Sequence, residues 1–311
     1  MSAYSHVPVM RDEAVNALQP VDAGVYLDGT FGGGGYAQAI LTRAACHLYA
    51  IDRDLEAVAR AERLVALFPG RFEIMAGRIS ELEQMLAARE VLALDGAVFD
   101  LGLSSYQIDD PARGFSFRQD GPLDMRMGQT GRSAADIVNS CAEAALADIL
   151  FNYGDEKASR RVARAIIERR AEKQFTTTAD LAGVIRSVVR ADKSGIDPAT
   201  RSFQALRIAV NEELTDIEAA LQQAASLLRP GGRLVVVSFH SLEDRIVKQF
   251  FAACVGRLPG ASRHDPAGLK PMVAPCFKLV TKGAMAPGAQ EIRVNPRARS
   301  AKLRVMERLA A

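Results

Sequence analysis

The feature that most constrains the fold is an alternation, within the first hundred residues, between short apolar runs and longer segments with helical periodicity. The apolar runs, which we expect to be buried strands, are residues 24–28, 47–52, 71–75 and 96–100. The helical segments between them are residues 36–43, 55–67 and 80–88. Strands joined by helical crossovers form a parallel sheet with helices on both faces, so the sequence predicts an α/β, Rossmann-like fold.

The alternation stops near Tyr106, and we predict an inserted all-helical domain after it. Residues 134–192 are helical in pattern without a convincing strand. A helix expected over 203–228 then ends at an Arg-Pro-Gly-Gly stop signal, and the apolar strand 233–239 follows. The expected boundaries are 1–105 for the first part of the α/β domain, 106–202 for the helical insertion and 203–311 for the second part of the α/β domain.

The composition fits a globular protein, with 49% hydrophobic and 24% charged residues. The four cysteines lie far apart and include no C-x-x-C pair, which argues against a zinc site and against a disulfide framework. The first residues lack the basic flank and apolar run of a secretion signal, and no run of about 18 apolar residues follows. We therefore expect a cytoplasmic protein with no metal and no membrane span.

The net charge of +2 says little about partners, but its distribution is uneven. Residues 157–173 contain seven lysines and arginines against two glutamates, and residues 293–308 contain six against one. Two concentrated basic segments indicate a polyanionic partner such as RNA. The alternative for each segment is the solvated face of an amphipathic helix.

A glycine-rich turn marks a candidate cofactor site. The sequence DGTFGGGG at 28–35 follows the first strand and runs into a helix, where glycine allows close approach of a ligand to the backbone. Asp28 precedes the glycines, and Asp52 ends the second strand, where an acid typically binds ribose hydroxyls. A tight turn without ligand and a nicotinamide dinucleotide site are the alternatives. Asp28, together with Asp100 at the end of the fourth strand, favours S-adenosylmethionine and a methyltransferase over a dehydrogenase.

Polar residues that follow the fourth and fifth strands are candidates for the chemistry, since loops at these strand ends face the ligand in a doubly wound sheet. After Asp100 come Ser104, Ser105 and Gln107, although turns are often rich in such residues for structural reasons alone. His240 follows the fifth strand. The two residues that we expect to cap the next helix are Ser241 and Asp244.

Seven motifs in order along nearly the whole chain resemble those of one family. They are DGTFGGGG at 28–35, AIDRD at 50–54, DLGLSSYQIDD at 100–110, RGFSFRQDGPLDMRM at 113–127, PATRSFQALRIAVNEEL at 198–214, SFHSLEDRIVK at 238–248 and NPRARSAKLRV at 295–305. By these motifs the chain is similar to the bacterial 16S ribosomal RNA cytosine N4-methyltransferases, the RsmH or MraW family.

The resemblance implies a methyltransferase core with an inserted helical domain that acts on a cytidine, cytidine 1402, in the decoding region of the small ribosomal subunit. Carried over by position, the cofactor contacts fall on Gly34, Gly35, Tyr36, Asp52, Ile79, Asp100 and Gln107. Three positions depart from the family pattern: Tyr36 replaces a histidine, Ile79 a phenylalanine and Tyr106 a proline. The sequence does not decide between a monomer and a homodimer.

The implied reaction sets demands on the site, because the exocyclic amine of cytosine is a poor nucleophile. The site must align the amine with the methyl group and accept hydrogen bonds from it. Asp100, Ser104, Ser105 and His240 are the candidates for this task. The target base must leave any stack to reach them. An RNA-binding assembly factor that keeps the fold without the reaction is the rival hypothesis, and the intact Asp28, Asp52 and Asp100 argue against it.

Overall fold

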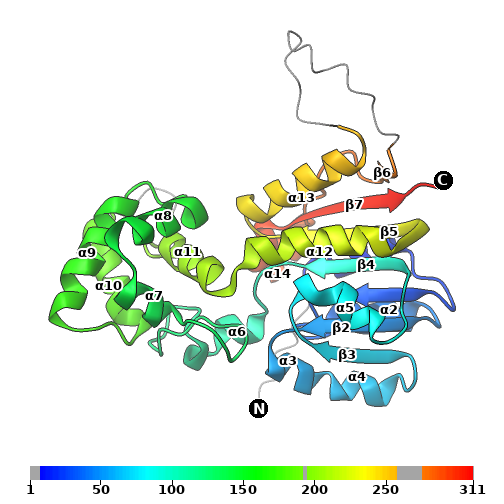
Figure 1. The fold of residues 1–311 in the computed structure, drawn as a ribbon, viewed down its shortest axis with the longest axis horizontal. Helices are drawn as coiled ribbons and strands as arrows, with labels where there is room; N and C mark the ends of the chain where they lie inside the picture. Colours follow the sequence, from blue (N-terminus) through cyan, green and yellow to red (C-terminus); the bar gives the residue numbers. More distant parts are fainter. Residues whose placement is uncertain (1–7, 192–194, 258–274, 311) are drawn as a thin grey trace, which may run out of the picture. The chain divides into compact units, whose positions relative to one another are not determined.

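The computed structural model describes residues 8–191, 195–257 and 275–310. The chain forms two compact units, each with its own core (Figure 1). Met1–Gly102 together with Leu214–Ala311 holds the sheet, whereas Leu103–Glu213 is helical. The first seven residues, on which the expectation about a secretion signal depends, lie outside the described part of the chain.

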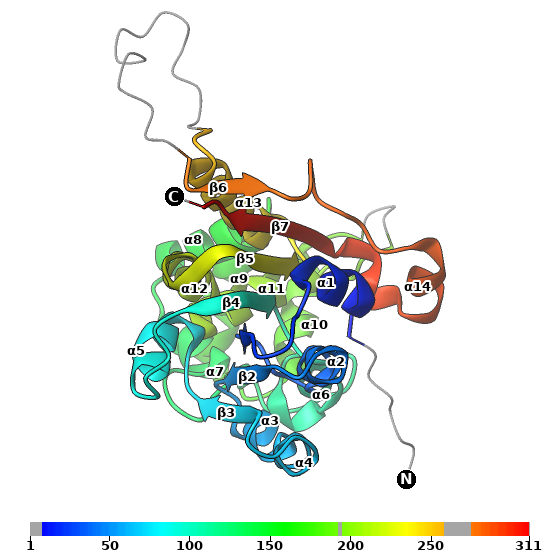
Figure 2. The same cartoon turned by 90° about the vertical axis from the view of Figure 1, so that its right-hand side faces the viewer.

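The sheet has seven strands in the order β3-β2-β1-β4-β5-β7-β6 (Figure 2). The strands are β1 (Val25–Asp28), β2 (His47–Asp52), β3 (Phe72–Ala76), β4 (Leu94–Asp100), β5 (Leu228–Ser238), β6 (Phe277–Leu279) and β7 (Lys302–Arg308). The first five are parallel, and β7 is antiparallel to both β5 and β6. A dinucleotide-binding sheet has the order 3-2-1-4-5-6, from which this sheet departs by the strand β7 between β5 and β6.

Helices cover both faces of the sheet, which confirms the predicted α/β class (Figure 2). The helices of this unit are α1 (Arg11–Leu18), α2 (Gly35–Arg43), α3 (Leu55–Arg60), α4 (Glu62–Leu67), α5 (Leu82–Ala87), α12 (Glu213–Leu227), α13 (Ser241–Cys254) and α14 (Ala289–Val294). Successive strand residues point to opposite faces, so Tyr26 packs in one core and Leu27 in the other. No helix in the described residues is long and apolar enough to cross a membrane.

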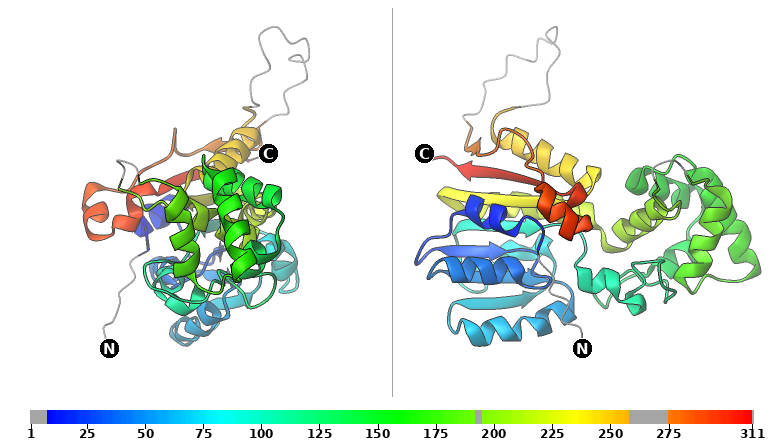
Figure 3. Two further views of the ribbon diagram at one scale, coloured as in Figure 1. Left: turned by 90° about the vertical axis from the view of Figure 1, so that its left-hand side faces the viewer. Right: turned by 180° about the vertical axis from the view of Figure 1, so that it is seen from behind.

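The helical unit, whose helices are drawn mostly in green in Figure 3, buries a separate apolar core. Its helices are α6 (Ser105–Asp109), α7 (Ala134–Ser140), α8 (Glu143–Gly154), α9 (Ser159–Glu172), α10 (Thr178–Val188) and α11 (Thr200–Asn211). The core-facing side chains recur three or four residues apart, as Val162 and Ile166 do on α9 and Leu181 and Ile185 on α10. This spacing explains why the segment showed helical periodicity and no strand pattern.

The helix expected over 203–228 is in fact two helices, and this changes the extent of the helical unit. Glu212 lies between α11 and α12 with a left-handed φ of 53°, which interrupts the helix. Phe203 and Leu206 on α11 pack in the core of the helical unit, so α11 belongs to that unit. Leu103–Glu213 therefore exceeds the expected range 106–202 at both ends. Three further elements of the sheet unit, α1, α14 and β6, were not predicted, and none of them is longer than eight residues.

Candidate active site

Three acids lie at one edge of the sheet, because they end three neighbouring parallel strands. Asp28 ends β1, Asp52 ends β2 and Asp100 ends β4. In the strand register, Asp28 pairs with Ala50 on β2 and with Val98 on β4. Asp52 lies two residues after Ala50, and Asp100 lies two residues after Val98, so both acids extend slightly beyond Asp28 at this edge. The crevice beyond the carboxyl ends of parallel strands is the usual ligand site of this architecture.

The turn between β1 and α2 requires glycine at two positions. Gly34 has a φ of 75°, and a Cβ there would lie 2.7 Å from the ring of Phe31. A Cβ on Gly35 would lie 2.0 Å from Pro8. Gly34 is also the N-cap of α2 and offers no side chain to the first turn, so backbone N–H groups at this helix start are left for other acceptors.

Hydrogen bonds connect the acids to the glycine turn. The carboxylate of Asp52 accepts from the backbone N–H of Gly32 at 2.7 Å and from that of Asp54 at 2.9 Å. Asp28 accepts from the N–H of Thr30 at 3.1 Å. The Thr30 hydroxyl in turn accepts from the backbone N–H of Asp100 at 2.6 Å. Thr30, which the sequence reasoning did not single out, thus joins the ends of β1 and β4.

Burial and the repulsion between neighbouring carboxylates raise the pKa values of acids at this edge of the sheet. Burial, together with the nearby charge of Asp52, raises the pKa of Asp28 to about 7. Burial, followed by the charges of Asp28 and Glu243, raises the pKa of Asp100 well above its usual range. Within the described residues, Oδ2 of Asp28 and Oδ1 of Asp100 have no hydrogen-bond partner. Buried polar atoms are normally paired, so the edge suits a ligand that brings positive charge or hydrogen-bond donors.

Two positions that depart from the family pattern behave differently. The side chain of Tyr36 is buried, and its hydroxyl donates to the carbonyl of Val9, so only the Tyr36 backbone remains at the start of α2 for a ligand. Ile79 begins a short 3₁₀ helix after β3 and is half-buried against the apolar core. The structure therefore offers an aliphatic side chain at the Ile79 position and no side-chain contact from Tyr36.

The candidates after β4 belong to the helical unit and cap its first helix. The Ser104 hydroxyl accepts from the Gln107 N–H at 3.3 Å, and Oε1 of Gln107 accepts from the Ser104 N–H at 3.0 Å. This reciprocal pair is a capping box at the start of α6, where Ser105 is the first residue. The structure thus places Asp28, Asp52, Asp100 and His240 in the sheet unit, and Ser104, Ser105 and Gln107 in the helical unit.

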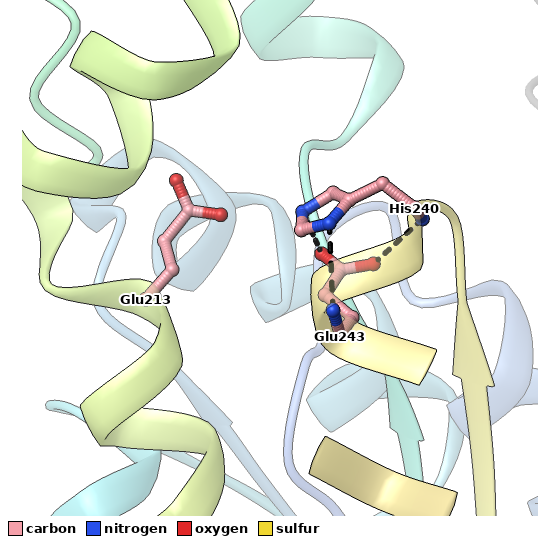
Figure 4. A group of neighbouring side chains, drawn as sticks. All are labelled: Glu213, His240 and Glu243. Carbon is pink, nitrogen blue, oxygen red and sulfur yellow. Dashed lines mark hydrogen bonds and ion pairs between the residues drawn. The ribbon is translucent and has the colours of Figure 1, made fainter. Parts of the chain in front are cut away.

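The cap of α13 differs from the expected pair of Ser241 with Asp244. His240 is the N-cap, and Glu243 is its partner (Figure 4). The figure also draws Glu213, the last residue of the helical unit. Asp244 instead pairs with Lys302 at 2.9 Å and with Arg304 at 2.8 Å, both on β7. The expected pairing of Ser241 was wrong because α13 begins at Ser241 itself, one residue earlier than a cap by the Ser241 hydroxyl would need.

The basic segments are partly neutralised within the protein. Arg169 pairs with Asp180 at 2.9 Å, and Arg308 donates to backbone carbonyls, including that of Leu228 at 2.6 Å. Lys302 and Arg304 are held by the same acid on α13. The exposed cations of the two segments include Arg160, Arg161, Arg293 and Arg299. The excess charge available to a polyanion is therefore smaller than the residue count indicates.

Comparison with known proteins identifies the family of the chain. The profile of the MraW methylase family matches residues 3–309. The chain is 64% identical to ribosomal RNA small subunit methyltransferase H of Acidiphilium cryptum, over 99% of this chain and 98% of that protein. It is 56% identical to the protein of the same name from Rhodospirillum rubrum, over 97% and 94%. A solved putative rRNA methylase from Clostridium thermocellum is 10% identical, covers 98% of this chain and all of its own, and superposes with a TM-score of 0.46. As its motifs predicted, the chain belongs to the MraW methylase family.

Proposed function

We propose that the protein transfers a methyl group from S-adenosylmethionine to N4 of a cytidine, cytidine 1402, in the decoding region of 16S ribosomal RNA. Membership of a methylase family supports methyl transfer, and relatives at 56–64% identity are named ribosomal RNA small subunit methyltransferase H. The structural observation that carries the proposal is the convergence of three strand-end acids, two of which keep a buried carboxylate oxygen without a partner. The small ribosomal subunit in the cytoplasm is the proposed setting.

The residues at the sheet edge fit S-adenosylmethionine. This cofactor carries a sulfonium and an ammonium group, and bound there it would supply an electrophilic methyl group. Asp52 would accept from its ribose hydroxyls, and the backbone of Gly34, Gly35 and Tyr36 would lie against it. Ile79 would contact the adenine through an aliphatic surface. The remaining contacts in the proposed set are Asp28, Asp100 and, from the helical unit, Gln107.

The proposed catalytic contribution of the protein is orientation and hydrogen-bond acceptance. Asp100 has an unsatisfied carboxylate oxygen, so it can accept a hydrogen bond from the target amine and concentrate electron density on its nitrogen. Ser104 and Ser105, at the start of α6, and His240 complete the proposed set. Because methylation at N4 needs no covalent intermediate with a thiol, the lack of cysteine between Asp100 and Gln107 agrees with N4 over C5 as the target atom.

Methyl transfer to small subunits that lack the modification tests the proposal. The purified protein, S-adenosylmethionine with a labelled methyl group and such subunits should give labelled 16S RNA, and mass spectrometry of its nucleosides should show N4-methylcytidine. Asp100→Asn, which keeps the side-chain shape, should bind subunits and transfer little methyl. A folded protein that binds subunits without transferring methyl would instead be an assembly factor, and a C5-methylated product would refute the N4 assignment.

A further inference from the structure

Glu243 is a buried acid with an unusual set of partners. Its side chain is completely buried at the first turn of α13. Oε2 accepts from the backbone N–H of Phe239 at 2.7 Å and from that of His240 at 3.2 Å. Oε1 lies 3.0 Å from Nε2 of the His240 imidazole (Figure 4). One carboxylate therefore holds both the backbone and the side chain of His240.

These contacts define which ring nitrogen of His240 carries hydrogen. Nδ1 accepts from the backbone N–H of Glu243 at 3.4 Å, so it presents a lone pair and carries no hydrogen. The hydrogen of the neutral ring is then on Nε2, which lies within ion-pairing distance of Oε1 of Glu243, and the negative charge of this carboxylate favours hydrogen on that nitrogen. Nδ1 uses its lone pair toward the Glu243 N–H and Nε2 carries the hydrogen, so neither ring nitrogen has a lone pair left to receive a proton from an incoming amine. The face and carbon edge of the ring are the parts that can meet a base.

The need to cap the first turn of α13 does not by itself explain why a histidine and a buried glutamate occupy these positions. Histidine is not among the favoured N-cap residues, and the other two capping boxes of the described chain use Ser104 and Ser133. Glu243 also lies near the end of β4, because a Cβ on Gly102 would stand 3.7 Å from its Oε1. Its charge contributes to the raised pKa of Asp100. A serine cap would start α13 without the need for a fourth acid at this edge.

We propose that Glu243 is a positioning residue for methyl transfer: it fixes the orientation and the Nε2–H tautomer of His240, so that the imidazole supports the target cytosine with its ring surface and does not take the amine proton. The proposal rests on the proposed function and deepens it. The proton then leaves by another route, with the carboxylate oxygen of Asp100 that has no partner among the described residues as the proposed acceptor. An orienting partner of this kind is typically worth roughly 10–100-fold in activity where it has been removed at other sites.

Two matched variants and their combination test the proposal. Glu243→Gln keeps an oxygen for the backbone N–H groups but replaces the negatively charged Oε1 beside Nε2 by an uncharged amide NH₂ group, which no longer favours hydrogen on Nε2. His240→Asn keeps a favoured N-cap and removes the ring. We expect each to lower kcat roughly ten-fold or more, with S-adenosylmethionine affinity within about two-fold. The double variant should lose no more than the single ones, because Glu243 acts through His240.

Nitrogen-15 NMR of histidine-labelled protein supplies a readout that is independent of turnover. The chain has only four histidines, so the His240 signals can be assigned by comparison with His240→Asn. We expect hydrogen on Nε2 in the wild-type protein and a changed pattern in Glu243→Gln. Hydrogen on Nδ1 in the wild-type protein, an unchanged kcat in a folded Glu243→Gln, or additive losses in the double variant would each overturn the proposal. Wild-type protein that transfers no methyl would refute the proposed function while the tautomer could still be read.

Discussion

Replacing Asp28 by asparagine should stabilise the protein without cofactor, and the gain should grow as the pH rises. Burial raises the pKa of Asp28 from 3.8 to about 7 in the folded state. Between these two values the folded chain keeps a proton that the unfolded chain has released, so the free energy of unfolding falls as the pH rises through this window. Asparagine has no charge to desolvate, and its oxygen can still accept from the N–H of Thr30.

The size of the effect follows from the displaced pKa. At about 1.4 kcal/mol for each pH unit of displacement, the cost of the buried carboxylate is roughly 1.7 kcal/mol at about pH 5 and roughly 4 kcal/mol at about pH 8. The free energy of unfolding of Asp28→Asn should therefore rise relative to the wild-type value by roughly 2–3 kcal/mol between these conditions.

Urea unfolding of both proteins at constant ionic strength, followed by circular dichroism, measures this difference. Asp148→Asn, on the exposed surface of α8, is the matched control and should show a gap to the wild-type protein that does not change with pH. The difference in free energy of unfolding between Asp28→Asn and the wild-type protein could instead stay constant from about pH 5 to about pH 8. That result would refute the conclusion that burial disfavours the charged form of Asp28.

Three further expectations follow from the site and the surface. Asp52→Ala should weaken S-adenosylmethionine binding by about ten-fold or more, because a charge-assisted hydrogen bond contributes about 1.5–3 kcal/mol; unchanged affinity of a folded variant by calorimetry would contradict the ribose contact. Reversing Arg297 and Arg299 to glutamate should weaken binding to the small subunit and make its salt dependence shallower, and an unchanged salt slope would mean that this cluster is only a solvated face. Replacing all four cysteines by serine or alanine should leave methyl transfer largely intact, whereas an inactive but folded Cys276→Ser would argue for a thiol intermediate.

Most of the sheet could be predicted because buried parallel strands leave a strong trace in the sequence. Residues 47–52 form β2 with the expected bounds, and the strand ends at Asp28, Asp52 and Asp100 are where the apolar runs stop. Strand order in such a sheet then follows from the connections, which places the three acids on one edge. The ligand side of the molecule was therefore predictable in outline from one hundred residues.

The finer features depend on tertiary contacts that local patterns do not encode. Propensity rules favour serine over histidine at an N-cap, yet α13 begins after His240 because buried Glu243 holds it there. The Tyr36 side chain is buried and its hydroxyl donates to the carbonyl of Val9, a contact between residues 27 apart in the sequence that no local pattern predicts. No Gly or Pro marks the break between α11 and α12 at Glu212, so the sequence pattern of the two helices was read as one continuous helix.

The buried acids also connect the stability of the free protein to its affinity for the cofactor. Within the described residues no lysine or arginine pairs with Asp28 or Asp100, so their repulsion and desolvation persist until a ligand brings positive charge. Proteins keep unfavourable features such as buried acids without a cationic partner mainly at functional sites. A cationic cofactor should lower the pKa of Asp28 as it binds and should recover part of the lost stability. Asp28→Asn, although more stable without cofactor, should therefore show a smaller increase in melting temperature on saturation with S-adenosylmethionine than the wild-type protein does. Equal gains in thermal-shift measurements at about pH 8 would mean that the cofactor's charge does not reach this carboxylate.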